Sequence, residues 1–191
     1  MALGGLKMNY RNYNKVQILF FLFLLLQFSV LAQTPGKERW EIKTLKDIDS
    51  YSIDTSTLDV TIYDLRNIPR PEGINRNTER LPLEIQQFTV VCKIKYVRLE
   101  KDGDYHVVVC DTNDVNSEMI VEIIKPSYGS TRYYQQFKKV RDTFTYYKRN
   151  RKLINQIFEI TGVGFFDLFH NQKGLAPNGI ELHPVLRMRK L

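Results

Sequence analysis

The segment from Phe88 to Ile124 constrains the fold of this 191-residue chain most strongly. Apolar and polar residues alternate from Val90 to Val97, which is the period of a half-buried β-strand. An Asp102-Gly103 pair then precedes a second apolar run, and Asp-Gly between two such runs is a strong signal of a β-hairpin. A third strand-like run stops at Pro126. The segment therefore predicts three consecutive antiparallel strands.

A helical pattern and two further strand-like runs follow. Between residues 131 and 152, aromatic and apolar residues recur every three to four positions, as on one face of a helix. Strand-like runs then cover 155–167 and 180–188. Three strands, a helix and two strands is the element order of the five-stranded OB barrel, whose first and fourth connecting loops flank the ligand face. We expect a mainly β, OB-like barrel with one helix; an α+β roll with the same element order is the alternative.

The chain divides into three parts. Three basic residues precede an unbroken apolar run from Ile18 to Leu26, and a Val-Leu-Ala sequence ends at Ala32. This order is typical of a secretory signal peptide over residues 1–32, which predicts a secreted or periplasmic protein with no further membrane-spanning run. A membrane anchor is the alternative, although a span needs about 20 apolar residues. Residues 33–86 are expected to form a β and loop extension that packs on the barrel domain, residues 87–191.

Two short patterns within that extension predict strands. Residues 58–65 alternate clearly, and the sequence from Trp40 to Thr44 is compatible with a second, shorter strand. In an exported protein Cys92 and Cys110 can pair, but a hairpin turn near residues 102–103 places them diagonally, at a spacing that strains a disulfide. We therefore expect two buried free thiols, and a disulfide is the alternative.

The basic residues are concentrated in the predicted helix. The chain has 28 Lys and Arg against 21 Asp and Glu, a net charge of +7. Residues 131–152 alone hold eight basic residues and one acid, with tyrosines among them that can stack on bases or sugars. Lys138, Arg141 and Lys148 are candidate contacts to an anionic polymer, either nucleic acid or envelope glycan. The alternative is a solvated helix face whose aromatic residues cover one end of the barrel.

All three histidines lie in clusters with carboxylates. The OB topology brings these clusters, together with Asn178 in the last loop, near one mouth of the barrel. The clusters contain Asp104 and His106, Asp167 and His170, and Glu181 and His183.

These clusters have three interpretations. In the first, Asp104, Asp167, His170 and Asn178 contact an anionic polymer at a face flanked by residues 101–106 and 170–183. In the second, the protein is a metal-assisted phosphodiesterase or nuclease, because imidazole and carboxylate are the usual metal ligands and proton carriers of hydrolytic sites. The candidate catalytic residues are then His106, His183 and Glu181, and the candidate ligands of a divalent metal are His106, His170 and His183. In the third, the clusters form a structural hydrogen-bond network.

Four motifs resemble a widespread family of exported bacterial proteins. They are Glu38-Arg-Trp-Glu-Ile-Lys-Thr44, Asp102-Gly-Asp-Tyr-His106, Gly164-Phe-Phe-Asp167 with His170, and Ala176-Pro-Asn-Gly-Ile-Glu-Leu-His-Pro-Val185. Together they span nearly all of the chain after the predicted signal peptide. The resemblance implies an exported bacterial protein and carries no established activity with it.

The first hairpin also resembles staphylococcal nuclease-like OB domains. There a strand-turn-strand with Asp-Gly-Asp supplies a calcium ligand, and Asp102-Gly103-Asp104 matches it here. Those nucleases carry an Arg in the third strand, whereas residues 118–124 contain none. The resemblance therefore implies the OB fold without the nuclease mechanism.

Overall fold

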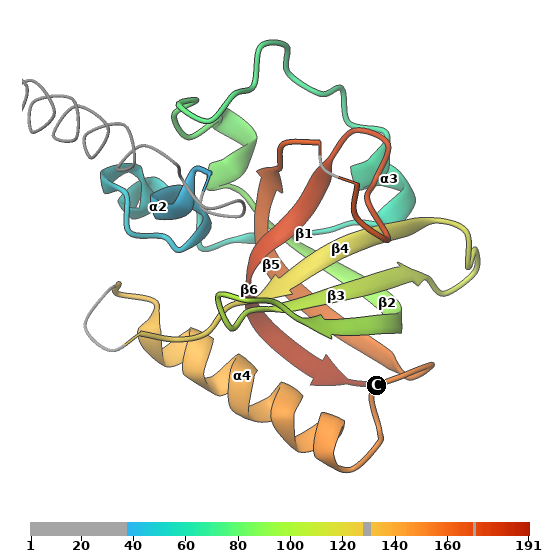
Figure 1. The fold of residues 1–191 in the computed structure, drawn as a ribbon. Coiled ribbons are helices and arrows are strands. Elements are labelled where there is room, and N and C mark those ends of the chain that lie inside the picture. Colours follow the sequence, from blue (N-terminus) through green and yellow to red (C-terminus); the bar gives the residue numbers. More distant parts are fainter. Residues whose placement is uncertain (1–37, 128–130, 170) are drawn as a thin grey trace, which may run out of the picture. The chain divides into compact units, whose positions relative to one another are not determined.

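Five long strands close into a barrel in the computed structural model, which describes residues 38–127, 131–169 and 171–191 (Figure 1). Neighbouring strands follow the order β2-β3-β4-β6-β5, and β5 also pairs with β2. The β4–β6 pair is parallel and the other barrel pairs are antiparallel. The predicted OB-like barrel is confirmed. Its strands are β2 (Gln87–Leu99), β3 (Tyr105–Asp111), β4 (Glu118–Ile123), β5 (Ile157–Phe166) and β6 (Ile180–Lys190).

The first hairpin forms where Asp102 and Gly103 predict it. Gly103 has a φ of 93°, a left-handed conformation that glycine adopts without strain. The Asp102 side chain accepts a hydrogen bond from the Asp104 backbone N–H at 3.0 Å, as turn aspartates commonly do. The turn therefore fixes the register of β2 against β3 from its first residues.

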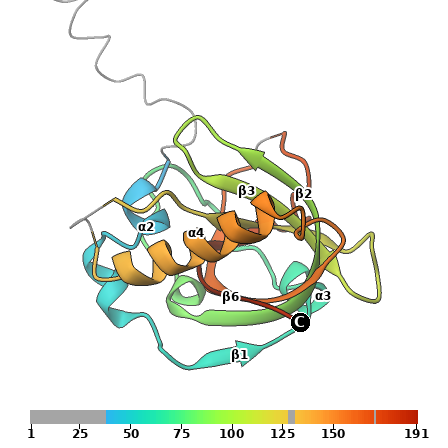
Figure 2. The same cartoon turned by 90° about the horizontal axis from the view of Figure 1, so that it is seen from below.

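Helix α4 (Tyr134–Arg149) lies across one end of the barrel (Figure 2). Its buried face consists of Phe137, Val140 and Phe144, which recur at helical spacing. Val140 and Phe144 join the main barrel core. The helix thus covers the barrel end with its apolar face, as one interpretation of the sequence predicts.

Residues 39–86 pack against the barrel, and Arg39–Leu191 form one compact unit. Strand β1 runs parallel to β2, and Ile62 and Leu65 of α3 enter the main core. The elements of this part are α2 (Trp40–Lys43), the 3₁₀ helix η2 (Ile48–Ser52), β1 (Thr57–Asp59), α3 (Ile62–Arg66) and the 3₁₀ helix η3 (Pro82–Ile85). The predicted signal peptide, residues 1–32, lies outside the described residues.

The two strands predicted in this part are wrong over most of their length. Residues 62–66 are helical because Thr61 and Asp64 form a capping box, in which each side chain bonds the other residue's backbone N–H. The Trp40–Lys43 segment is the helix α2, where Lys43 bonds the Arg39 carbonyl at 3.0 Å. Both segments are short, and a short apolar run carries too little periodicity to separate helix from strand.

Both cysteines are buried and free, as predicted. Cys92 belongs to the inner core, whereas Cys110 lies opposite Lys93 in the β2–β3 register. Successive residues of a strand point to opposite faces, so the two thiols lie on opposite sides of the sheet. This separation excludes the disulfide more firmly than the diagonal spacing expected from the sequence.

A buried polar face and an open basic groove as candidate functional sites

The outer face of the barrel carries a row of ionisable side chains across β3, β4 and β6. His106 lies opposite Glu122 in the β3–β4 register, and Glu181 lies opposite both Ile120 of β4 and Phe165 of β5. The neighbours of these residues along each strand point inward to the core. The strand pairing therefore brings together residues that are far apart in the sequence.

His106 is held by hydrogen bonds at both ring nitrogens. Its Nε2 lies 3.0 Å from the Lys173 carbonyl, which can only accept, so Nε2 carries a proton. Its Nδ1 lies 2.9 Å from Oε1 of Glu122. Burial raises the pKa of Glu122 well above its ordinary value, and nearby Glu181 and Asp104 raise it further. Glu122 and His106 therefore form a close buried pair across β3 and β4.

His183 and Glu181 form a second buried pair. Nδ1 of His183 lies 3.0 Å from Oε1 of Glu181, and His183 is only 5% exposed. Burial, assisted by the Lys43 charge, lowers the pKa of His183 to about 3. The ring is therefore neutral and donates from Nδ1, which leaves Nε2 as a bare acceptor. No described residue hydrogen-bonds this Nε2.

Helix α2 lies over this polar face. The Lys43 ammonium lies 2.8 Å from Oδ1 of Asp167 and 5.2 Å from the centre of the Phe165 ring. Burial alone would lower the Lys43 pKa, but Asp167 and Glu181 raise it above its ordinary value, so the side chain stays charged. Arg39 stacks on the same ring and forms a buried ion pair with Glu84. Two residues of the 38–44 motif, Arg39 and Lys43, therefore place buried cations at this face.

Asp104 and Asn178 bond backbone groups at the two ends of the face. Asp104 accepts a hydrogen bond from the Lys125 N–H, and burial raises its pKa to about 6. The Asn178 amide donates to the carbonyls of Leu65 and Ile68 at 2.8 and 2.9 Å. These contacts join loops and helix α3 to the barrel.

The expected convergence of clusters is present, but the convergent side chains are buried. Residues expected to contact a ligand or substrate bond one another, the backbone or α2 instead; they are Asp104, His106, Asp167, Asn178, Glu181 and His183. His170 lies outside the described residues. Within the part of the chain that the structure describes, no group of three or more His, Cys, Asp or Glu is placed to hold a metal ion. The observed contacts are those of a hydrogen-bond network.

Glu122 and Lys43 are central to this network, and sequence reasoning did not single them out. Glu122 carried one signal, since it is an acid within an apolar strand and falls opposite His106 once the hairpin register is drawn. Lys43 lies in the 38–44 motif, but nothing in that motif predicts its contact with Asp167, because only the tertiary structure brings the two together.

The three basic residues proposed on the helix are engaged locally. Lys138 pairs with Asp142 one turn away at 2.6 Å. Arg141 donates to the carbonyls of Ile123 and Gly103 and lies 3.9 Å from the centre of the Tyr105 ring. Lys148 lies 3.3 Å from the same tyrosine's hydroxyl. Arg141 and Lys148 therefore fasten α4 to the barrel rather than project toward a ligand.

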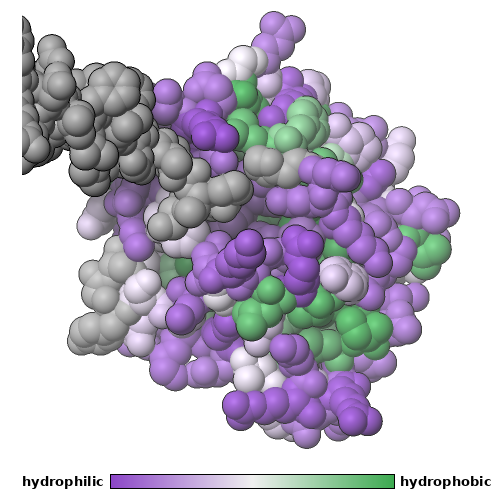
Figure 3. All heavy atoms as spheres, viewed as in Figure 1, coloured by the Kyte–Doolittle hydropathy of each residue, from purple (hydrophilic) through white to green (hydrophobic). Residues whose placement is uncertain are grey.

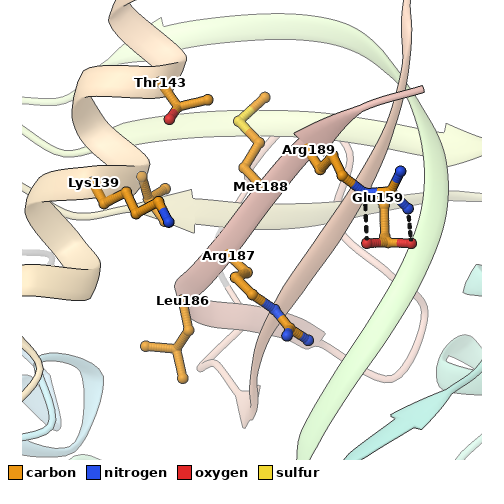
Figure 4. Close-up of a pocket in the computed structure, with 8 residues that line it drawn as sticks. Lys139, Thr143, Glu159, Leu186, Arg187, Met188 and Arg189 are labelled. Carbon is orange, nitrogen blue, oxygen red and sulfur yellow. Dashed lines mark hydrogen bonds and ion pairs between the residues drawn. The ribbon is translucent and has the colours of Figure 1, made fainter.

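An open groove of about 430 Å³ lies between α4 and β6 (Figure 4). Val140, Leu186 and Met188 supply its apolar part. Arg189 pairs with Glu159 at 2.8 Å, whereas exposed Lys139 has no partner among the described residues. The full lining is Lys139, Val140, Thr143, Glu159, Leu186, Arg187, Met188 and Arg189.

A second open groove, of about 440 Å³, has the opposite charge. Its lining includes Asp59, Asp64, Asp111 and Glu159, without a basic residue. Elsewhere, the face viewed in Figure 3 is mainly hydrophilic, with apolar side chains in scattered groups. The α4–β6 groove is therefore the one of these two grooves whose charge suits an anionic ligand.

Comparison with known proteins adds no relative to this picture, since the chain matches no protein-family model and no curated protein. Across the described residues, none of the helices combines the length and apolar character that a membrane span needs.

Proposed function

We propose that this protein is an OB-like binding module for an anionic polymer, and that the polymer binds in the groove between α4 and β6. The observation that carries the proposal is the combination of an open groove, an apolar floor and the cations Lys139 and Arg187 at its sides. Among the described residues, Arg187 donates to the neutral Thr161 hydroxyl at 3.2 Å, and the nearby Glu159 carboxylate, whose pKa Arg187 helps to lower, is ion-paired with Arg189. Along the face flanked by residues 101–106 and 170–183, which the sequence favours, the described site side chains are buried and bonded to one another, to the backbone or to Lys43, so it is not the site we propose.

The helix side of the groove supports a polymer rather than a small anion. Thr143 and Tyr146 follow Lys139 at positions i+4 and i+7, so the three lie along one side of α4. Tyr146 is 59% exposed, and such a ring can stack on a base or a sugar beside a cation that contacts a phosphate or sulfate. Nucleic acid and anionic envelope glycan both present this chemistry.

Binding by residues 33–191, the predicted mature chain, tests the proposal. We expect single-stranded DNA or a sulfated glycan to bind in fluorescence anisotropy at low ionic strength, with affinity falling as salt rises. Lys139→Glu and Arg187→Glu should each weaken binding, and each lost phosphate contact lowers the salt slope by about one. Lys101→Glu, the same charge reversal at an exposed turn, is the matched control. Undetectable binding of both polymers at low salt would exclude nucleic acid and glycan as the polymer, and unchanged affinity in both groove variants would contradict the groove as the binding site.

We also propose that the protein is exported, on the strength of the N-terminal sequence pattern. Mass spectrometry of the protein recovered from the periplasm or the medium should find an N-terminus at Gln33. Recovery of an uncleaved chain in the membrane fraction would favour the anchor instead.

A second candidate function is hydrolysis, and the bare Nε2 of His183 is the observation that favours it. A histidine that donates from Nδ1 to a carboxylate and leaves Nε2 as an acceptor has the orientation of a general base, and a substrate reaches this buried Nε2 only when the structure over it opens. His183→Gln should then abolish phosphodiester turnover by the wild-type protein, while Lys101→Glu keeps it. Absence of turnover in the wild type, with a lowered melting temperature in His183→Gln, would leave only the structural role.

A further inference from the structure

Strand β6 pairs with β4 over only two residues and then continues in the barrel paired with β5 alone. The β4–β6 ladder contains two residue pairs, Ile120 with Glu181 and Val121 with Leu182. β6 then continues to Lys190, paired with β5 along one side only. Its other side faces α4 and the groove (Figure 4). The groove therefore runs along an edge of β6 that has no strand partner among the described residues.

The hydrogen-bond pattern of β6 shows which backbone groups point to this edge. The Leu191 N–H donates to the Ile157 carbonyl at 3.1 Å, so Leu191 is a hydrogen-bonded position of the β5–β6 ladder. Such positions alternate in an antiparallel pair, and Arg189 is the next one. The N–H and C=O of Met188 and Lys190 consequently face away from β5. No described residue hydrogen-bonds them.

The side chains around this edge alternate in character. Met188 is half-buried toward the core, whereas Arg187 and Arg189 on either side of it are exposed. Across the groove, Val140 is apolar and Lys139 is exposed and basic. An occupant with apolar and acidic groups at strand spacing matches this pattern.

We propose that the groove receives an extended acidic peptide that adds as a strand to the edge of β6. The inference rests on the proposed function and narrows its anionic polymer to a polypeptide. Only a polypeptide carries N–H and C=O groups at the spacing of the β6 backbone, and edge addition uses them for affinity while alternate side chains give specificity. Nucleic acid and glycan satisfy the charge of the groove but not this backbone edge.

The test uses residues 33–191 and a short labelled peptide of alternating Glu and Val, measured by fluorescence anisotropy. A matched peptide, N-methylated at every residue, keeps the charges and side chains but has no N–H on either edge to donate to a strand. We expect salt-sensitive binding of the first peptide and at least about tenfold weaker binding of the second, because each lost hydrogen bond costs about 1 kcal/mol. Equal binding of the two peptides would overturn the proposal.

Met188→Pro tests the same edge from the protein side. Proline removes an N–H that the β5 ladder does not use, so the variant should keep the barrel and bind the peptide about fivefold more weakly, as expected for one lost hydrogen bond. Lys101→Pro, a proline at the second position of the exposed turn closed by the Gly103 N–H and the Glu100 carbonyl, is the control outside the groove and should bind normally. If Met188→Pro unfolds the protein, the difference in affinity of the wild type for the two peptides still tests the proposal.

The outcomes separate this inference from the proposed function. Binding of single-stranded DNA or sulfated glycan in the groove, with no peptide binding, would overturn the strand-addition proposal and leave the anionic-polymer proposal standing. Failure of all three probes at low salt would overturn both.

Discussion

The outer face beneath α2 and the groove between α4 and β6 are both rich in charged side chains, yet their environments differ. Beneath α2, every carboxylate, imidazole or ammonium named above has a described partner at one or more atoms, and the side chains are buried. In the groove, Lys139 and Arg187 are exposed and keep their charge available. Compensated charges beneath α2 hold the structure together, and uncompensated charges in the groove are available to a ligand.

This difference has an energetic basis. Taking an ion out of water costs several kcal/mol, which a buried partner must offset. An exposed cation such as Lys139 keeps its hydration and adds little to folding stability. Loss of a charge should therefore act on stability beneath α2 and on binding in the groove, and the following predictions test that separation in order of decreasing effect.

Removal of the His183 ring should change acid stability most. The pKa of His183 falls from 6.5 in the unfolded chain to about 3 in the folded protein, so the unfolded chain binds the proton first and stability is lost as pH falls from 6.5 toward 3. The full loss is about 5 kcal/mol at 1.36 kcal/mol per pKa unit. His183→Gln should flatten this pH dependence in urea titrations. A wild type and variant that lose stability in parallel over this range would contradict the assignment.

Lys43→Met should destabilise the protein by about 3 to 5 kcal/mol at pH 7, because it leaves the Asp167 carboxylate buried without its cation. The double variant Lys43→Met with Asp167→Asn should recover part of this loss. Lys138→Met, which breaks the exposed pair with Asp142, is the control and should change stability by less than about 0.5 kcal/mol. Urea denaturation measures all three, and equal effects of the two lysine substitutions would remove the distinction between the regions.

Asp104→Asn should stabilise the protein by about 2 to 3 kcal/mol above pH 6. The folded protein holds the Asp104 proton more tightly than the unfolded chain, since the pKa rises from 3.8 to about 6, so stability falls as pH rises through that interval. Asparagine keeps an oxygen for the Lys125 N–H and carries no charge to bury. The difference between variant and wild type should vanish below pH 4. A variant that is less stable than the wild type at pH 8 would refute this reading.

Lys139→Ala should have the smallest effect on stability, within about 0.5 kcal/mol, since its side chain is exposed and unpaired among the described residues. The same variant should weaken anionic-polymer binding and lower its salt slope by about one. Unchanged binding together with a clear loss of stability would reverse the roles given to the two regions.

Much of the barrel follows from local sequence. The alternation in residues 90–97, the Asp102-Gly103 turn and the helical spacing around Phe137 and Phe144 each depend on near neighbours, and each element formed as expected. The failures occurred in the extension, where α2 and α3 are only four and five residues long. Helix α3 begins at a capping box of Thr61 and Asp64, and a Thr followed three residues later by an acid is a local signal of a helix start.

The candidate site was predictable only in part. The sequence placed His106, Glu181 and His183 near one another, because strand order follows from the fold class. Glu122 completes the first pair, and only a residue-by-residue β3–β4 register places it opposite His106. The sequence predicts Arg141 and Lys148 as ligand contacts. In the structure they bond Tyr105 and a turn carbonyl instead, and no local pattern predicts such contacts between distant segments.

The sequence by itself determined which residues face the barrel core and which face outward, because that choice depends on a period of two along each strand. Only the tertiary structure decided which outward residues meet water. Helix α2 is distant in the sequence from β6, yet its Lys43 closes the face that carries Glu181 and His183. β6 parts from β4 after two residue pairs and leaves its edge beside α4. Exposure is a property of how distant segments pack, and no local pattern encodes it.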